Sequence, residues 1–324
     1  MSFLKAFCFY ALLCCSSYTI YAQTNQDVDD VVSDLILLSQ EYINPAAIGV
    51  SYQASAGWYT TAVKKEQWNL ELSLQGGVLA LPDKFKTFSI NQSQLRNLRV
   101  IDGGERVTFP TSIGGTDISE LEGTINGDTF RFDAPEGIDQ DYVSQVQVQA
   151  ALTVWKGTTI IGRFSPRIEI KETSYNTFGV GVHHNLSQWF NKNTSNFSLG
   201  ALIAYSNFNV EDTFSNINVV IGNLNSVEVQ GDSFTYQLTA TQQINKFSIS
   251  GGLGFILSTF DYEVGGDGDL ILSILNTVLN NTSNSNSEFK ADLSLDYKIG
   301  DFSVNSMLTF GRFVNLTLGL NYNL

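Results

Sequence analysis

The chain has 324 residues, 43% of them hydrophobic and 12% aromatic, and it carries a formal net charge of −14 at pH 7. This hydrophobic content excludes a disordered chain, which combines low hydrophobicity with high net charge. Only 18 Lys and Arg stand against 32 Asp and Glu, which excludes nucleic acid as a partner because phosphates require clustered cations.

Residues 1–22 are predicted to form a secretory signal peptide that is cleaved after Ala22. Lys5 precedes an apolar centre, and small or polar residues lead to the cleavage site. The apolar run of about ten residues is too short to span a bilayer as a helix. The mature chain is expected to lack disulfides, because all the cysteines lie in this segment: Cys8, Cys14 and Cys15.

An amphipathic helix is predicted over residues 27–42. Its apolar side chains recur at spacings of three and four, and acidic residues crowd the first turn, where the helix dipole favours them. Pro45 is predicted to end the helix, because the residue before a proline avoids the helical conformation. Residues 23–50, with the motif Asn44-Pro45-Ala46, are predicted either to plug a barrel from within or to form a periplasmic arm.

Residues 51–324 are predicted to form an all-β, antiparallel transmembrane β-barrel of about 12 strands, within a range of about 10–14. Apolar and polar residues alternate along most of this region, for example from Glu288 to Ile299. A soluble sandwich has the same alternation in shorter strands, so the length of these runs favours the barrel. The predicted strands are 54–63, 67–79, 120–132, 143–155, 158–172, 174–185, 196–208, 232–245, 247–260, 288–299, 301–312 and 314–324.

The connections between these strands are predicted to separate by length. If the last strand ends in the periplasm, the tight turns near residues 156, 246 and 300 all lie on the periplasmic side. The long polar loops 209–231 and 262–287 then lie outside the cell, as in outer-membrane barrels. The segment 80–119 is also predicted on the periplasmic side, where its length is unusual.

The polar faces of two predicted strands are expected to line the lumen. They carry charges of both signs, which favours ion pairs that fill or narrow the barrel, although a solute path is the alternative. The predicted lumen-lining residues are Arg163, Arg167, Glu169, Lys171, Lys290, Asp292, Asp296 and Lys298.

Neither catalytic residues, metal ligands nor a cofactor site are predicted, and the chain is not expected to be an enzyme. His183 and His184 are adjacent in a predicted strand, so their side chains point to opposite faces and cannot share one metal ion. The segment 265–269 resembles a calcium-binding repeat but occurs once, and an extracellular loop is the simpler interpretation.

The chain resembles a family of outer-membrane β-barrels from Bacteroidota whose function is unknown. The resemblance rests on four segments that span most of the mature chain: Gly57–Ala62, Trp155–Arg163, Gly179–Trp189 and Gly251–Gly254. It implies a barrel without implying a ligand. More distantly, the helix and Asn44-Pro45-Ala46 are similar to the N-terminal hatch of the long-chain fatty-acid outer-membrane transporters, in which ligand leaves sideways into the membrane.

These features together predict a protein of the bacterial outer membrane that passively transports small, hydrophobic solutes. The alternative is a structural, assembly or secretion-associated scaffold without transport of its own. The expected partners are outer-membrane lipid and a small hydrophobic ligand, with no nucleic acid. The oligomeric state stays open.

Overall fold

The computed structural model describes residues 26–324, except 59, 118, 191–195, 220–221 and 281–283. The predicted signal peptide, residues 1–22, lies outside the described residues. Among the residues that are described, no helix is long and apolar enough to cross a membrane.

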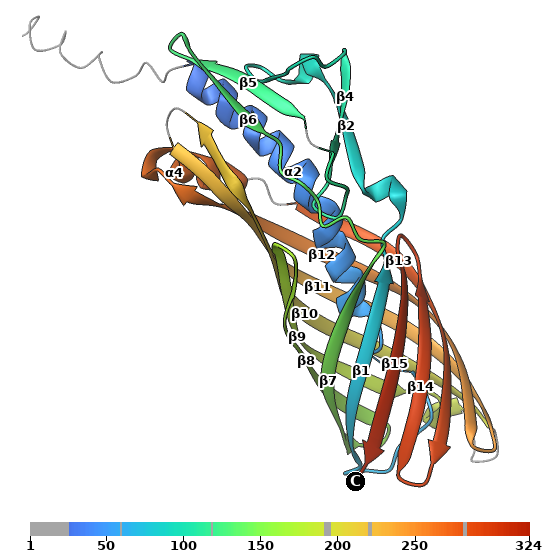
Figure 1. Ribbon diagram of the computed structural model, residues 1–324. Helices are drawn as coiled ribbons and strands as arrows, with labels where there is room; N and C mark the ends of the chain where they lie inside the picture. Colours follow the sequence, from blue (N-terminus) through green and yellow to red (C-terminus); the bar gives the residue numbers. More distant parts are fainter. Residues whose placement is uncertain (1–25, 59, 118, 191–195, 220–221, 281–283) are drawn as a thin grey trace, which may run out of the picture.

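Ten antiparallel strands close into a barrel in the described part of the chain (Figure 1). The predicted all-β antiparallel barrel is confirmed, and its ten strands fall at the lower end of the predicted range of about 10–14 rather than at the expected twelve. Their order around the barrel is β1-β15-β14-β13-β12-β11-β10-β9-β8-β7. Their bounds are β1 (Leu70–Ala80), β7 (Tyr142–Trp155), β8 (Thr158–Ile170), β9 (Thr173–Asn185), β10 (Phe197–Val219), β11 (Gly222–Ile244), β12 (Phe247–Asp267), β13 (Asn284–Ile299), β14 (Phe302–Phe310) and β15 (Val314–Asn323).

Two predicted barrel strands were wrong. The segment 120–132 forms most of a hairpin, β5 (Glu120–Ile125) and β6 (Asp128–Asp133), which pairs with β3 (Arg99–Val100) in a separate sheet beyond the barrel. Its alternation is real, but the apolar face packs on neighbouring protein, where Leu121 and Ile125 are buried, instead of facing outward. Alternation marks a two-faced strand and does not say which medium its apolar face meets.

The second error is the segment 54–63, which runs inside the barrel. Its first two residues end a helix, and the Ala62 N–H donates to Thr241 Oγ1 at 2.7 Å on the inner wall. Because the strand predicted at 120–132, between β1 and β7, is absent from the barrel, β1 runs in the opposite direction to the one predicted. Segment 80–119 therefore lies at the end opposite the C-terminus, where it contributes β2 (Thr87–Asn91) and β4 (Arg106–Pro110) (Figure 1).

The C-terminus and the turns that follow β7, β11 and β13 lie at one end of the barrel (Figure 1). The other end carries the long extensions of β10, β11 and β12, together with α4 (Asp269–Asn280). The predicted loop 209–231 is thus mostly strand, and the predicted loop 262–287 contains strand ends and a helix. The ends of these strands extend beyond the apolar outer surface of the barrel, so their outward residues are polar. For this reason the sequence predicted loops there.

Helix α2 (Gln26–Ser55) enters the barrel from the end opposite the C-terminus (Figure 1). The prediction that it ends before Pro45 was wrong, since 30 residues are helical and Pro45 lies inside. A proline costs a helix one backbone hydrogen bond and adds a clash. Here the turns after Pro45 are buried inside the barrel, with Ala47 and Tyr52 fully enclosed, and this burial offsets the cost. The helix also crosses the predicted domain boundary at residue 50.

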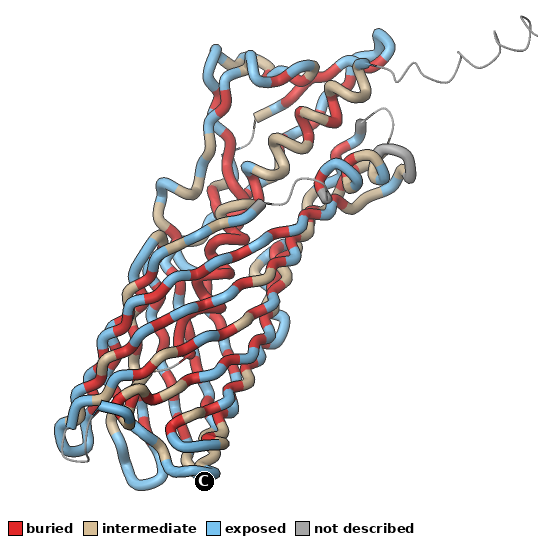
Figure 2. The backbone as a smooth tube through the Cα atoms, turned by 180° about the vertical axis from the view of Figure 1, so that it is seen from behind, coloured by how far each residue is buried: buried red, intermediate tan, exposed pale blue. Residues whose placement is uncertain are grey.

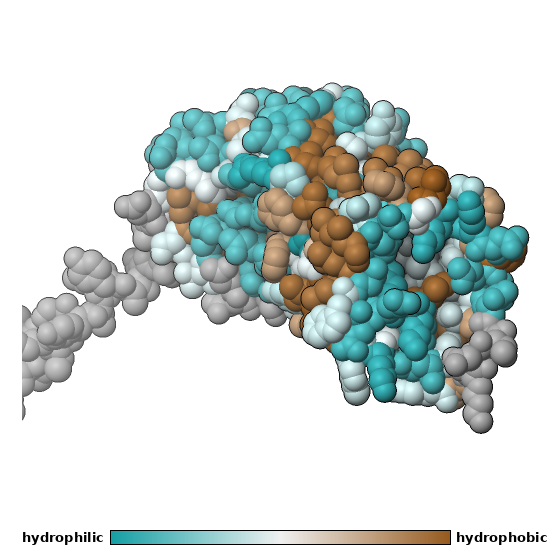
Figure 3. All heavy atoms as spheres, turned by 90° about the horizontal axis from the view of Figure 1, so that it is seen from below, coloured by the Kyte–Doolittle hydropathy of each residue, from teal (hydrophilic) through white to brown (hydrophobic). Residues whose placement is uncertain are grey.

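Burial in the barrel is reversed relative to a soluble protein. Along its strands buried and exposed residues alternate (Figure 2), and the exposed ones are apolar. On β15 Leu318 is 55% exposed, whereas the inward-facing Thr317 is 2% exposed. Near the C-terminal end the interior is lined by Gln, Asn, Ser and Thr, while towards the other end it becomes apolar, with Phe208 and Phe260 facing α2. Viewed from the C-terminal end, hydrophobic patches border hydrophilic areas (Figure 3).

Candidate functional site: the plugged lumen

Two buried cations on opposite walls of the barrel hold the last carbonyl groups of α2. Arg163 Nη1 on β8 donates to Ala56 O at 2.7 Å and to Ala54 O at 3.2 Å. Lys290 Nζ on β13 donates to Ser55 O at 2.8 Å. The last carbonyls of a helix have no partner within it and form the negative end of its dipole, so cations stabilise them. We call Arg163 and Lys290 the cation clamp.

Both cations have further partners, as buried charges require. Lys290 is paired with Asp292 Oδ2 at 3.0 Å on the same face of β13. The Arg163 guanidinium lies 4.2 Å from the ring centroid of Trp58 and donates to Gln149 Oε1 at 3.1 Å. The clamp and its partners therefore form a compact polar cluster that links the end of α2 to both sides of the barrel wall.

After the helix, the chain passes down the lumen to the start of β1 and remains hydrogen-bonded to the wall. We call residues 56–58 and 60–69 the descending segment. Gly57 turns the chain with a φ of +72°, a conformation that favours glycine. Ser294 Oγ donates to Thr60 O at 2.5 Å, and Asn185 Nδ2 donates to Ala62 O at 2.6 Å. The lumen is thus crossed by protein both at the end of the helix and below it.

A second anchor holds α2 beyond the apolar outer surface of the barrel. Tyr42 Oη donates to Asp212 Oδ2 on β10 at 2.5 Å, and Asp212 also accepts from Thr173. Burial, followed by the nearby Asp212 carboxylate, raises the pKa of Tyr42, so its hydroxyl stays protonated and acts as a donor. The helix is therefore fixed along its length and not only at its end.

Two apolar cavities follow one side of α2. The upper pocket, about 50 Å³, lies between the helix, the β2–β4 sheet, the β5–β6 hairpin and the long strands. The plug pocket, about 30 Å³, lies deeper, beside Pro45. The upper pocket is lined by Leu35, Leu38, Ser39, Tyr42, Phe88, Phe109, Pro110, Leu121, Phe132, Ala134, Pro135, Phe214, Ile217, Leu224, Val227 and Val264. The plug pocket is lined by Pro45, Ala46, Gly49, Val50, Leu79, Leu81, Ile113, Ile138, Val143, Ile170, Thr173, Tyr175 and Val210.

The plug pocket lies against a discontinuity in the barrel wall, which we call the β7–β8 seam. The ladder between β7 and β8 ends at the pair Val148–Phe164, and the register of β8 shifts after Ser165. Beyond this point side-chain hydroxyls replace backbone pairing: Ser165 Oγ donates to Val146 O at 2.8 Å, and Tyr175 donates to Ser144 O. Pro166 contributes to the break because it has no N–H for a ladder.

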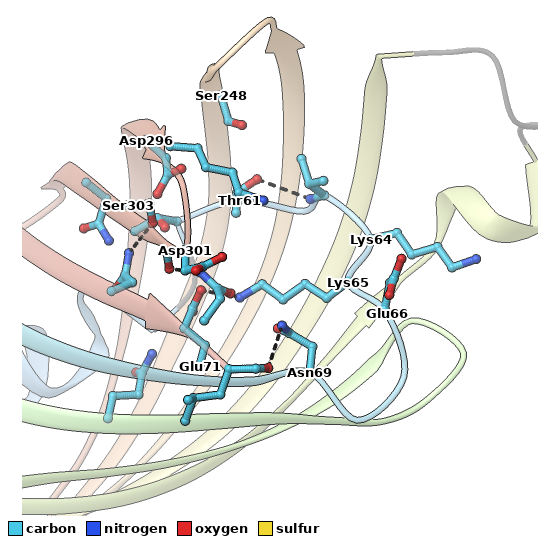
Figure 4. A pocket seen from close by; sticks show the side chains of 18 of the residues that line it. Thr61, Lys64, Lys65, Glu66, Asn69, Glu71, Ser248, Asp296, Asp301 and Ser303 are labelled. Atoms are coloured by element: carbon cyan, nitrogen blue, oxygen red, sulfur yellow. Dashed lines mark hydrogen bonds and ion pairs between the residues drawn. The ribbon is translucent and has the colours of Figure 1, made fainter.

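A polar cavity of about 540 Å³, the mouth cavity, opens at the C-terminal end of the barrel (Figure 4). Lys65 from the descending segment reaches Glu71 Oε2 at 2.6 Å across it. Asp296 and Ser303 point into it from β13 and β14. The plug closes this cavity towards the clamp, so it is a blind recess.

The structure divides the predicted lumen-lining residues into three groups. Arg163, Lys290 and Asp292 meet at the helix end, and Asp296 and Lys298 line the mouth cavity. The remaining three, Arg167, Glu169 and Lys171, do not face the lumen.

Their outward position follows from the register shift in β8. After the shift Ile168 and Ile170 pack on the core, so the charged residues that alternate with them face outward. Arg167 pairs there with Glu211 at 2.8 Å. Pro166 was the available signal, since a proline within a strand marks a bulge or an edge.

The predicted plug motif lies within α2. Asn44 borders a polar recess together with Arg312, while Pro45 and Ala46 line the plug pocket. Sequence patterns did not point to Trp58, Ser165 or Tyr175, whose roles depend on chain segments that are distant in the sequence.

Comparisons with known proteins establish the family. The whole chain, residues 1–324, matches the model of a family of unknown function (DUF6588), and the chain belongs to that family. No curated protein sequence matches it.

Three solved structures illustrate its similarity to outer-membrane barrels. The translocator domain of autotransporter NalP from Neisseria meningitidis is 10% identical, with 88% of this chain and 99% of that chain covered and a TM-score of 0.41. The outer membrane protein OprG from Pseudomonas aeruginosa is 10% identical, with 80% and 97% covered and a TM-score of 0.32. A Pseudomonas aeruginosa FadL homologue is 12% identical, with 76% and 61% covered and a TM-score of 0.32.

Proposed function

We propose that this protein is a bacterial outer-membrane barrel that lets small hydrophobic solutes pass from the upper pocket, along α2, to the β7–β8 seam and into the bilayer. One observation carries the proposal: the two apolar pockets follow α2 to the place where the barrel wall lacks backbone pairing. The axial route is crossed by the clamp and by the descending segment.

The dimensions of the apolar outer surface support the membrane location. On β12 the outward positions are apolar from Phe247 to Leu257 and then become Thr259, Asp261 and Glu263. A strand rises about 3.3 Å per residue, so this stretch is about 33 Å long. At a tilt of about 40° it gives a band about 25 Å tall, which is the height of the lipid-facing band of outer-membrane barrels. We call this band the apolar belt.

The arrangement of connections supports an orientation. Outer-membrane barrels place short turns in the periplasm and long connections outside. The two longest connections, from β1 to β7 and from β12 to β13, both lie at the end opposite the C-terminus. The C-terminal end is then periplasmic, and α4 and the 81–141 segment face the exterior. The upper pocket therefore lies on the side from which external solutes arrive.

The chemistry of the route favours hydrophobic solutes. The pockets are small in this structure, so a solute enters by parting side chains that touch through apolar contacts. Polar solutes would lose hydrogen bonds to water there without replacement, at a cost of about 1–3 kcal/mol per group. An apolar solute has no such cost.

The test is the rate at which a neutral hydrophobic dye, fluorescent only in membranes, enters cells that produce the protein. Ser165→Ala with Tyr175→Phe removes the two hydroxyl bonds that close the seam. Each such bond contributes about 1 kcal/mol. If opening of the seam limits the rate of dye entry, removing both bonds should raise that rate about 30-fold. Cells without the protein give the background.

A matched control lies on the same two strands. Thr153 and Thr159 share a hydroxyl hydrogen bond of 3.0 Å within the paired part of the β7–β8 ladder. The double variant Thr153→Val with Thr159→Val should leave dye entry unchanged. If both double variants behave like the natural protein, the seam is not the route.

A scaffold without transport is the second candidate, and the filled lumen favours it. Production of the natural protein would then leave dye entry at the background rate. The seam variant would also leave it there. That pair of results would replace the transport proposal with the scaffold.

A further inference from the structure

A hollow of about 670 Å³ interrupts the apolar belt on the outside of the barrel, and we call it the belt hollow. Ala150 of β7 and Gly162 of β8, which pair in register, contribute two small residues to its lining, and larger apolar side chains surround them. Its lining comes from six strands: β1, β7, β8, β9, β14 and β15.

The surface offered by the hollow is hydrocarbon. Leu74, Phe164 and Phe178 are each about half exposed at its edge, at 54%, 48% and 51%. Ser73, Gln149, Arg163 and Asn321 belong to the lining, but their side chains are turned to the barrel interior, where they are buried. A bilayer core supplies no water to fill such a hollow. Hydrocarbon must therefore occupy it.

The hollow runs across the belt, from Phe302 and Tyr322 at the C-terminal end to Phe164 and Phe178, beyond which the next positions on the same faces of β8 and β9 are Pro166 and Asn176. Phe302 begins β14 and Tyr322 lies near the end of β15, and their rings are 4.8 Å apart. Trp155 ends β7 and Trp68 precedes the start of β1, so both lie at that same end of the barrel; they are 64% and 67% exposed. Tryptophan favours the membrane–water interface. The C-terminal end of the hollow therefore lies near the membrane–water interface on that side.

We propose that the belt hollow is a binding site for one acyl chain of a membrane phospholipid. The proposal rests on the membrane location given under Proposed function and not on the passage of solutes. A chain in the hollow contacts protein on several sides, whereas a chain on the rest of the belt contacts it on one. The added dispersion contacts hold it in preference to the surrounding lipid. The volume falls within the roughly 300–1,000 Å³ of small-molecule sites.

Gly162 gives a means of filling the hollow without disturbing the barrel. A Cβ built on Gly162 meets nothing within 4 Å, so a large side chain there projects into the hollow. Gly251 on β12 is also outward-facing and has open space within 4 Å. Gly251→Phe is therefore a matched control for Gly162→Phe, with the same substitution on a lipid-facing strand outside the hollow.

The experiment uses the full mature chain in phospholipid vesicles containing a phosphatidylethanolamine with a photoreactive diazirine in one acyl chain. After illumination, adducts are mapped by mass spectrometry. In the natural protein and in Gly251→Phe, adducts on the hollow residues Leu72, Val148 and Phe164 should exceed those on Phe255 and Leu257 of β12 at least fivefold. Gly162→Phe should reduce this ratio to about one.

The outcomes separate the two proposals. Uniform labelling around the belt in the natural protein, or an unchanged ratio in Gly162→Phe, overturns the acyl-chain site while leaving the membrane location intact. Absence of acyl-chain adducts anywhere on the belt overturns the membrane location itself. Folding of each variant is checked by retention of β-sheet circular dichroism in the vesicles, and Gly162→Leu repeats the test with a smaller side chain.

Discussion

Substitution of Lys290 by Met tests the cation clamp most directly. The change removes the hydrogen bond to Ser55 O at the end of α2 and the ion pair with Asp292. Lys290 is fully buried, and Asp292 is 7% exposed. Breaking a buried pair by removing one partner costs about 3–5 kcal/mol, because the other charge stays uncompensated. Lys290→Met should therefore destabilise the folded barrel by about 3–5 kcal/mol.

The double variant Lys290→Met with Asp292→Asn separates the two contributions. Asparagine carries no charge, so only the charge-assisted bond to the helix end is lost, at about 1.5–3 kcal/mol. The double variant should thus be more stable than Lys290→Met alone. The measurement is urea unfolding in lipid vesicles, followed by tryptophan fluorescence. A double variant as unstable as the single one, or a single variant as stable as the natural protein, would refute the clamp reasoning.

Two further predictions address the belt and the turn after the plug. Leu253 is 60% exposed on the lipid face of β12, so Leu253→Arg places a charge in the bilayer. The free energy of unfolding measured in vesicles should fall by about 2–4 kcal/mol. Leu253→Ala should lower it by less than half as much. Gly57→Ala should cost at least about 1–2 kcal/mol, because Gly57 has a φ of +72° and the new Cβ would lie 2.8 Å from Gln75 Oε1. Thermal unfolding in detergent checks it, with Gly127→Ala (φ +88°, open space) as the control for backbone strain alone.

The alternation of side chains was enough to predict most of the barrel. The run from Glu288 to Ile299 was found almost in full within β13 (Asn284–Ile299), since an amphipathic strand keeps its period of two regardless of its surroundings. The same property caused the error at 120–132, because a hairpin packed on protein and a strand facing lipid share one pattern. Because strand directions alternate along the chain, one extra predicted strand also placed segment 80–119 at the wrong end of the barrel.

The clamp could be predicted only in part. Alternation assigned Arg163 and Lys290 to the polar face of their strands, and the structure places both inside the barrel. Their partner, the end of α2, depends on the helix continuing past Pro45, which local propensity argues against. Burial within the barrel decides this, and it is a tertiary effect. The β7–β8 seam likewise depends on a register shift for which Pro166 was the single local sign.

The relative cost of two openings indicates where a solute can pass. Withdrawing the plug breaks three charge-assisted bonds, from Arg163 to Ala54 and Ala56 and from Lys290 to Ser55, at about 1.5–3 kcal/mol each. It also breaks three neutral bonds below the helix, at about 1 kcal/mol each, so the total is at least about 7 kcal/mol.

Opening the seam breaks two neutral hydroxyl bonds, at a total of about 2 kcal/mol. The difference of at least about 5 kcal/mol corresponds to more than three orders of magnitude in population, since each 1.4 kcal/mol is about tenfold. By these hydrogen bonds alone, opening the wall costs less than opening the axis, as the proposed route requires. On the proposed route, a solute that leaves through the wall would enter hydrocarbon, which selects for apolar molecules by the same physics that holds the barrel in the membrane.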